Sequence, residues 1–195
     1  FKIKMPIYIA RQHMRHRMAS INELSGRYAE VEEDFEIPGE LNYQSPINNQ
    51  GCDPDGVLDN QLDLMDDMAE CTLENWYMYD KLLEEGVARE QARTILPLNT
   101  HTTFIWKINL HNLLHYLQLR LDSHAQREIR EYAQRICELI TPLVPWTMEA
   151  FWDYRMNSIT FTGTDLAYLR GEISTIPNSR ERDEFDKKVW VIHRC

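Results

Sequence analysis

The pattern of apolar and polar positions predicts a strand followed by a helix at the start of the chain. Residues 1–5 alternate as a strand does, and Pro6 fits the first turn of a helix that we expect to run to about Arg17. The predicted apolar side of that helix consists of Ile7, Ala10, Met14 and Met18. Arg11, Gln12 and Arg15 fall on other sides of it.

Weaker patterns separate this start from the next helix. Residues 28–37 form a weak strand candidate. Residues 37–60 contain three prolines and three glycines, which predicts a long loop. Residues 100–108 are rich in β-branched and aromatic side chains and predict a further strand.

Apolar residues recur at helical spacing in several later segments. The helices predicted from them cover residues 60–85, 88–95, 110–121, 125–143 and 145–154. We expect Gly86 to end the first of these, Asn109 to open the third and Asp122 to cap the fourth. After Asn157 the pattern weakens, and residues 179–188 predict a solvated surface or tail. The sequence therefore predicts a helix-dominant α+β fold, with a small antiparallel sheet flanked by helices and a long central helix.

Size and charge limit the classes of protein. A chain of 195 residues predicts a single domain, and no apolar run approaches the roughly 20 residues that span a bilayer. We expect a cytoplasmic protein. The net charge is −10, yet residues 1–28 carry six Lys or Arg against one acid. Such a cluster on an acidic background suits one small, multiply charged anion better than a nucleic-acid polymer.

The cysteines and histidines show no pattern of a metal site or a nucleophile. Four cysteines lie at long, irregular spacings, and reduced thiols are expected. Cys71 lies among acids and Cys137 on an apolar helix face, so we expect both to serve packing rather than catalysis. HExxH, paired CxxC and GxGxxG motifs are all missing from the sequence. We therefore expect no metal and no Rossmann turn.

The densest polar stretch is residues 11–28, RQHMRHRMASINELSGRY. The triplet at 15–17 alone would also fit a solvated helix end, where cations complement the helix dipole. The continuation adds an acid, a hydroxyl, a glycine and another arginine, a set able to clamp a phosphate and to hydrogen-bond a sugar or base. Ser25 suits ligand binding better than nucleophilic attack, because a serine nucleophile needs an adjacent base and His16 is nine residues away.

This stretch resembles the RHR-x7-S motif of flavin-dependent thymidylate synthases, within R-Q-x-x-R-H-R-x-A-S-x-N-E-x-S-x-R-Y. Residues 92–109 and 113–133 resemble two further blocks of that family in the same order, and residues 145–151 also fit. The resemblance covers about residues 1–155. It implies that an upstream strand segment of the family, with a histidine and hydroxyl residues against flavin, precedes Phe1. His111 and His115 depart from the Arg and Asn of some members.

The resemblance implies an enzyme that methylates deoxyuridine monophosphate (dUMP) to thymidylate (dTMP). Methylenetetrahydrofolate supplies the carbon, and FAD, itself reduced by NADPH, supplies the hydride. A homotetramer with active sites between subunits is implied, with neither a nucleic-acid polymer nor a membrane as partner. Two alternatives stay open: a non-catalytic flavin- or nucleotide-binding module, and a nucleic-acid-binding domain that uses the basic helix.

The family pattern also implies the site residues. Those expected to bind dUMP are Gln12, Arg15, Glu23, Leu24, Ser25, Gly26, Arg27, Arg93 and Arg120. Those expected to bind FAD are Arg15, His16, Arg17, Glu23, Asn109, His111, His115 and His124. Arg27 and Arg93 suit the phosphate. Arg120 is the catalytic candidate, because a guanidinium beside the pyrimidine stabilises negative charge that develops in the ring.

Two of these residues also have a plainer interpretation when each is considered alone. Arg120 would fit a surface salt bridge. His124 would fit a hydrogen-bonded structural histidine. Only the surrounding sequence blocks favour the ligand contacts.

Overall fold

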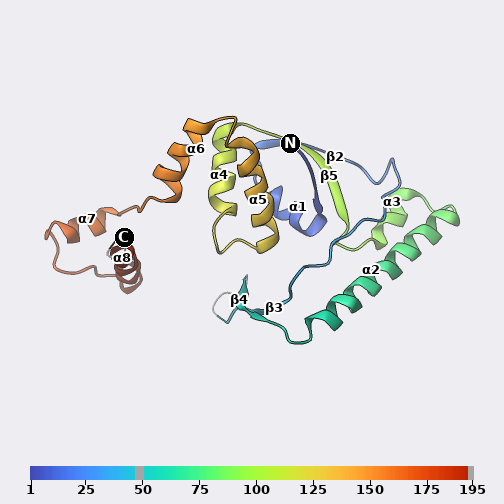
Figure 1. Cartoon of the computed structure of the whole chain (residues 1–195), viewed down its shortest axis with the longest axis horizontal. Coiled ribbons are helices and arrows are strands. Elements are labelled where there is room, and N and C mark those ends of the chain that lie inside the picture. Colours follow the sequence, from blue (N-terminus) through green and yellow to red (C-terminus); the bar gives the residue numbers. More distant parts are fainter. Residues whose placement is uncertain (47–50, 193–195) are drawn as a thin grey trace. The chain divides into compact units, whose positions relative to one another are not determined.

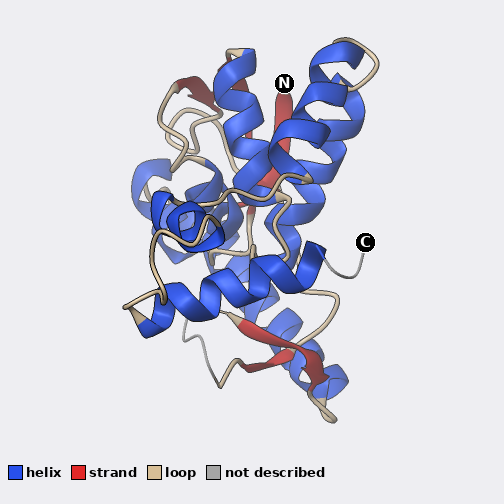
Figure 2. Cartoon of the chain, turned by 90° about the vertical axis from the view of Figure 1, so that its left-hand side faces the viewer, coloured by secondary structure: helices blue, strands red, loops and turns tan. Residues whose placement is uncertain are grey.

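β5 (His101–Ile108) is the central strand of a three-stranded antiparallel sheet, between β1 (Lys2–Pro6) and β2 (Ala19–Glu23). Phe104 and Trp106 are buried in β5, whereas Ile105 between them is 50% exposed, so one face of the strand meets the core. The structure is a computed structural model and describes residues 1–46 and 51–192. It confirms the helix-dominant α+β class (Figure 2).

Three helices pack with this sheet: α1 (Ile7–His13), α4 (Leu110–Arg120) and α5 (Arg127–Ile140). Figure 1 shows them grouped beside β5. The buried residues of α5 recur every three or four positions, as the sequence predicts: Ile129, Ala133, Ile136, Cys137 and Ile140. In α4, Asn109 is the N-cap, and its side chain accepts a hydrogen bond from the Asn112 N–H at 2.9 Å.

A second, smaller core lies under α2 (Gln61–Glu84), α3 (Arg89–Ala92) and the short 3₁₀ turn η1 (Arg93–Ile95). Trp76, Tyr79 and Ala92 form its buried centre. The predicted long helix is confirmed. Gly86 follows α2 at a φ of 81°, a left-handed conformation that costs glycine little, and so ends the helix as expected.

Four predictions about elements or their ends are wrong. α1 ends at His13 rather than near Arg17, because the chain leaves the helix to form β2. Residues 28–37 are not a strand, since only Phe35 makes an isolated bridge, to Thr100. The predicted loop at 37–60 contains the hairpin of β3 (Asn42–Gln44) and β4 (Cys52–Val57), and its residues 47–50 lie outside the described residues. Asp122 accepts from the His124 N–H instead of capping α5, whose N-cap is Gln126.

The structure divides the chain into two compact units, Phe1–Leu143 and Val144–Cys195, and a single domain stays a prediction. The second unit contains α6 (Pro145–Phe151), the π-helical turn η2 (Trp152–Met156), α7 (Gly163–Leu169) and α8 (Ser179–Ile192). Residues 179–188, predicted to be a solvated surface or tail, are helical and mostly exposed. Phe185 is buried, and Lys188 Nζ lies 2.6 Å from the buried Asp165 carboxylate. The highly charged sequence pattern predicts neither feature.

None of the helices in the described parts of the chain is long and apolar enough to cross a membrane.

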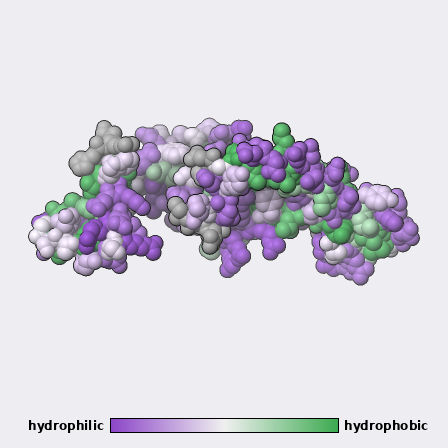
Figure 3. All heavy atoms as spheres, turned by 90° about the horizontal axis from the view of Figure 1, so that it is seen from below, coloured by the Kyte–Doolittle hydropathy of each residue, from purple (hydrophilic) through white to green (hydrophobic). Residues whose placement is uncertain are grey.

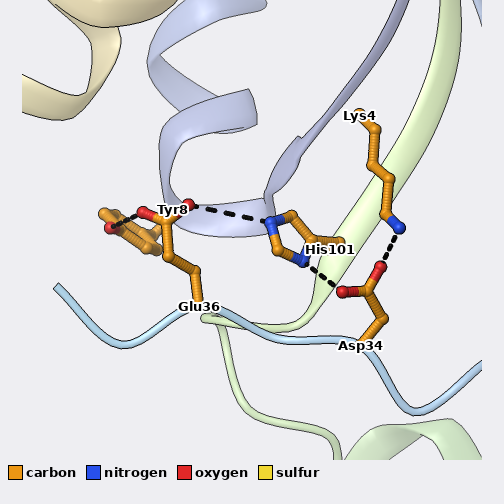
Figure 4. Close-up of polar contacts among 5 residues, drawn as sticks. All are labelled: Lys4, Tyr8, Asp34, Glu36 and His101. Atoms are coloured by element: carbon orange, nitrogen blue, oxygen red, sulfur yellow. Dashed lines mark hydrogen bonds and ion pairs between the residues drawn. The ribbon is translucent and has the colours of Figure 1, made fainter. Parts of the chain in front are cut away.

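A polar network holds the chain after β2 against the sheet (Figure 4). Lys4 forms an ion pair with Asp34, and His101 Nδ1 lies 3.0 Å from Asp34 Oδ1. His101 Nε2 lies 3.7 Å from Glu36 Oε2, and the Tyr8 hydroxyl donates to Glu36 Oε1 at 3.4 Å. Side chains of β1, α1 and β5 therefore fix residues 34–36.

This network predicts a pH-dependent loss of stability in Asp34→Asn. The hydrogen bond from Lys4 holds the pKa of the Asp34 carboxyl below its usual value. A pKa that is lower in the folded state contributes stability that is present above the unfolded pKa and is lost as pH falls through the folded one. We expect Asp34→Asn to lower the free energy of unfolding by about 1–2 kcal/mol at pH 7, and by less below about pH 4.

Urea unfolding of both proteins at pH 7 and pH 3 measures this difference. Asp66→Asn, on an exposed position of α2, is the control and should leave stability nearly unchanged. A deficit in Asp34→Asn that stays the same at both pH values would contradict the assignment.

Candidate active site

A pocket of about 480 Å³ lies where the connection from α1 to β2 meets α4. Because α1 ends at His13 and β2 begins at Ala19, the basic triplet belongs to this connection rather than to a helix. Basic, imidazole and apolar side chains form the wall together: Arg15, His16, Arg17, Met18, Ile108, Asn112, His115, Leu119 and Arg120. The fold thus brings together five residues that the sequence assigns to a site.

His16 and Arg120 are directly hydrogen-bonded in this wall. Arg120 Nε donates to His16 Nε2 at 3.1 Å, and Arg120 Nη2 donates to the Gln12 carbonyl at 3.4 Å. A guanidinium has only donors, so His16 Nε2 must be the acceptor, and its imidazole is neutral with hydrogen on Nδ1. Burial, together with Arg120 and His115, lowers the pKa of His16 to about 4. The neutral state therefore persists at neutral pH.

Two buried residues lie behind this pair. His13 is fully buried, and its Nδ1 lies 3.1 Å from the Tyr116 hydroxyl. Burial lowers the pKa of His13 to about 3 and raises that of Tyr116 well above its usual value. The Tyr116 ring meets the His13 and His16 rings edge-on, with centroids at 4.9 and 4.8 Å.

His13 and Tyr116 were not among the site residues predicted from the sequence. The buried residues of α1 are Ile9, Ala10 and His13, a spacing of three and four positions that marks the inner face of a short helix. The predicted apolar side shares only Ala10 with this buried face, because the helix was expected to continue to Arg17. Met18, Ile108, Asn112 and Leu119 of the pocket wall were likewise not predicted as site residues.

Arg15 and Arg17 supply uncompensated positive charge. Both side chains are exposed, and neither guanidinium has an ion-pair or hydrogen-bond partner among residues 1–46 and 51–192. An arginine without a carboxylate partner is available to a phosphate or another anion, which it can bind through two parallel hydrogen bonds.

Four of the other expected dUMP residues, Leu24, Ser25, Gly26 and Arg27, lie in a turn after β2. Leu24 N–H donates to the Thr103 carbonyl at 2.9 Å, and Tyr28 N–H donates to the Ser25 carbonyl at 3.1 Å. Ser25 Oγ accepts from the Arg27 N–H at 3.3 Å. The site for a Cβ on Gly26 lies only 3.6 Å from Arg93 Cδ. Gly26 and Arg93, 67 positions apart in the sequence, therefore lie together.

Carboxylates from neighbouring elements reach this turn. Arg27 Nη2 lies 3.1 Å from Glu90 Oε2, and both side chains are exposed. Glu23, at the end of β2, accepts from the Thr102 hydroxyl at 2.5 Å. Arg93 is exposed and has no ion pair within the described residues. The turn thus presents one paired and one unpaired guanidinium.

Four further expected site residues have side chains in neither the pocket wall nor the turn after β2. Asn109 caps α4, and His111 is exposed on its first turn. His124 is exposed, with its Nδ1 2.8 Å from Asp122 Oδ1. The Gln12 side chain lies against Gln126. Flavin contacts of the first three residues and a dUMP contact of Gln12 stay predictions.

The thiols differ in burial. Cys137 is buried, and burial raises its pKa, whereas Cys52 and Cys71 are exposed. The packing prediction therefore describes Cys137 and not Cys71. No three His, Cys, Asp or Glu side chains of the described residues are grouped so as to hold a metal ion.

Known proteins share this sequence and fold. Residues 1–146 match the sequence profile of the family described as thymidylate synthase complementing protein. The chain is 42% identical to a flavin-dependent thymidylate synthase of Dictyostelium discoideum over 98% of its own length and 64% of that protein. It is 43% identical to the one of Thermus thermophilus over 88% of its length and 62% of that protein. The chain thus spans slightly under two thirds of these relatives.

A solved structure is also similar. The UMP/dUMP methylase PolB of Streptomyces cacaoi, bound with 5-Br UMP, superposes with a TM-score of 0.73 at 32% identity. The match covers 79% of this chain and 73% of that one.

The close approach at Gly26 predicts that a methyl group there is destabilising. A Cβ would lie 2.8 Å from Val31 Cγ2, and the Val31 N–H is tied to the Tyr79 hydroxyl at 3.0 Å, so the valine cannot retreat freely. We expect Gly26→Ala to lower the free energy of unfolding by about 1–2 kcal/mol. Val31→Ala in the same chain should restore part of it.

Chemical denaturation of the single and double variants measures this. Gly39→Ala is the matched control, because no atom lies within 4 Å of the Cβ it would add. Equal stability of the Gly26→Ala and Gly39→Ala variants would show that Val31 yields easily and that the approach is not restrictive.

Proposed function

The chain belongs to the flavin-dependent thymidylate synthase family, and on that premise we propose that it methylates dUMP to dTMP. One observation carries the proposal. The pocket brings Arg15, His16, Arg17 and His115, which the family pattern assigns to FAD, together with Arg120, which it assigns to the pyrimidine. The similar UMP/dUMP methylase is described with a brominated uridine nucleotide, which supports a pyrimidine nucleotide as ligand.

The pocket fits a ligand that has both an anionic and an apolar part, as FAD has. The guanidiniums of Arg15 and Arg17 suit the phosphates, and Met18, Ile108 and Leu119 supply an apolar wall. His16 adds an N–H donor without adding charge, because it is neutral. When bound, FAD would supply the hydride that completes the methyl group.

The turn after β2 suits the phosphate of dUMP. Arg93 has no competing carboxylate among the described residues, and the exposed pair of Arg27 with Glu90 is of a kind worth little, so an anion can replace it. Gly26 lets the backbone lie close to Arg93. We assign Glu23, Leu24 and Ser25 beside it to the same nucleotide, together with Gln12, whose carbonyl accepts from Arg120.

Arg120 suits the charge that develops in the substrate. As a nucleophile or hydride adds to the uracil ring, negative charge accumulates on its carbonyl oxygens, and a fixed guanidinium stabilises it. His16 and the Gln12 carbonyl occupy Nε and one Nη2 hydrogen, and Nη1 has no partner among the described residues. Arg120 thus keeps donors for the ring while two hydrogen bonds hold it in place.

Methylenetetrahydrofolate as carbon donor, NADPH as reductant and a homotetramer complete the proposal. The tetramer is supported by large apolar side chains that the single chain leaves exposed, such as Leu62 and Tyr77 of α2. Figure 3 shows green, hydrophobic groups of atoms among purple, hydrophilic ones on the face that it draws. Sites shared between subunits would join the pocket of one chain to the turn of another.

The purified chain tests the function directly. It is supplied with FAD, dUMP, methylenetetrahydrofolate and NADPH, and dTMP is measured by chromatography. We expect a yellow protein that forms dTMP only in the complete mixture. Bound flavin without dTMP would favour the alternative, a non-catalytic flavin- or nucleotide-binding module, and neither flavin nor dTMP would overturn both.

Substitutions of two arginines should separate chemistry from binding. Arg120→Ala should slow single-turnover dTMP formation at saturating ligands by roughly a hundred- to a thousandfold, since one such donor is worth about 2.7–4 kcal/mol. Arg120→Lys should recover little, because a point charge does not replace the planar fork. Arg27→Ala should mainly raise the KM for dUMP, because the phosphate keeps its charge during the reaction.

Arg135→Ala, which removes an exposed ion pair on α5, is the control and should leave both constants unchanged. Parent-rate dTMP formation by Arg120→Ala would remove its catalytic assignment.

A further inference from the structure

His13 is a buried titratable residue for which neither the family motif nor the proposed reaction provides a role. Its side chain is fully buried, and Nδ1 is satisfied by the Tyr116 hydroxyl at 3.1 Å. Nε2 has no hydrogen-bond partner within the described residues. The ring is enclosed by aromatic side chains, with the Trp106 centroid at 4.3 Å and the Phe104 centroid at 5.5 Å. Burying a polar ring with one nitrogen unsatisfied costs stability. We therefore expect the remaining hydrogen bond to have a role that an apolar side chain could not fulfil.

Contacts lead from this hydrogen bond to the pocket. The Tyr116 ring, held at its hydroxyl by His13, meets the His16 ring at an interplanar angle of 74°. His16 in turn accepts from Arg120 at 3.1 Å. Each step is a direct contact, and the far end is the guanidinium in the pocket wall.

We propose that His13 and Tyr116 are positioning residues that orient Arg120 through His16. The His13–Tyr116 hydrogen bond holds the Tyr116 ring, the ring sets the tilt of the His16 imidazole, and His16 Nε2 then aims Arg120 Nε. The inference rests on the proposed role of Arg120 toward the pyrimidine.

The arrangement requires an uncharged His16. A protonated imidazole would have no lone pair for Arg120 and would repel it. The titratable and charged groups around His16 are His13 from α1, His115, Tyr116 and Arg120 from α4, and the flanking Arg15 and Arg17. None of them is a carboxylate, and burial keeps the Tyr116 phenol neutral, so nothing in this set favours the charged form.

Removing the Tyr116 hydroxyl breaks the hydrogen bond to His13 but keeps an aromatic ring at position 116. Tyr116→Phe leaves both nitrogens of His13 without a partner, so His13 must turn or admit water, and the ring beside His16 loses its anchor. Water that reaches His16 favours its protonated form. The pKa of His16 therefore reports on the contact without any ligand.

The experiment is a pH titration of the full chain labelled with ¹⁵N-histidine, followed by NMR. We expect His16 to titrate near pH 4 in the parent and about one unit higher in Tyr116→Phe. Single-turnover dTMP formation should fall roughly tenfold, with little change in the KM for dUMP. Tyr8→Phe is the matched control. It removes a different tyrosine hydroxyl, the one on the half-buried Tyr8 that donates to Glu36, and should change neither quantity.

His13→Leu keeps the inference testable if Tyr116→Phe does not fold, because it removes the same hydrogen bond from the other side. The double variant should be no worse than either single one, since the two side chains act through one bond. An unchanged His16 pKa in folded Tyr116→Phe and His13→Leu proteins, or an equal shift in Tyr8→Phe, would overturn the proposal. Absence of dTMP from the parent would instead refute the proposed function and leave the titration valid.

Discussion

The pairing of β2 with β5 is the constraint on which the site depends. Ala19 to Glu23 pair in antiparallel register with Ile108 to Phe104, and to reach that position the chain leaves α1 at His13. The residues before β2 then lie against α4 as the wall of the pocket. The residues after it form the turn beside Arg93. One five-residue strand thus separates the two halves of the basic motif, by roughly 17 Å at about 3.3 Å per residue.

The electrostatics of the pocket depend on which of its side chains stay neutral. Arg15, Arg17 and Arg120 already place three positive charges around one pocket, and a charged His16 beside them would be repelled. Burial and hydrogen bonding keep His16 and His13 neutral instead. The positive charge of the wall is therefore carried by arginines, which do not titrate in the physiological range.

The sequence predicts those elements whose ends or conformation are determined by neighbouring residues. The Asn109 cap opens α4, Gly86 ends α2, and the β-branched and aromatic run predicts β5. β2 and the β3–β4 hairpin are not predicted, because their stability comes from pairing with other strands and local propensity does not include such pairing. The motif resemblance named most of the pocket's polar residues. It could not supply His13 and Tyr116, because their role arises only where α1 and α4 meet.

The seven positions between the basic triplet and Ser25 are mostly strand, and a strand repeats every two residues. Inserting or deleting one residue there would turn every following side chain of β2 to the opposite face of the sheet and would displace the turn from Arg93. A change of two residues would preserve the faces and alter only the separation. The motif therefore depends on whether the number of intervening residues is odd or even, as well as on a suitable length. Single-residue insertions or deletions between Met18 and Leu24 should be rarer among functional relatives than substitutions at the same positions.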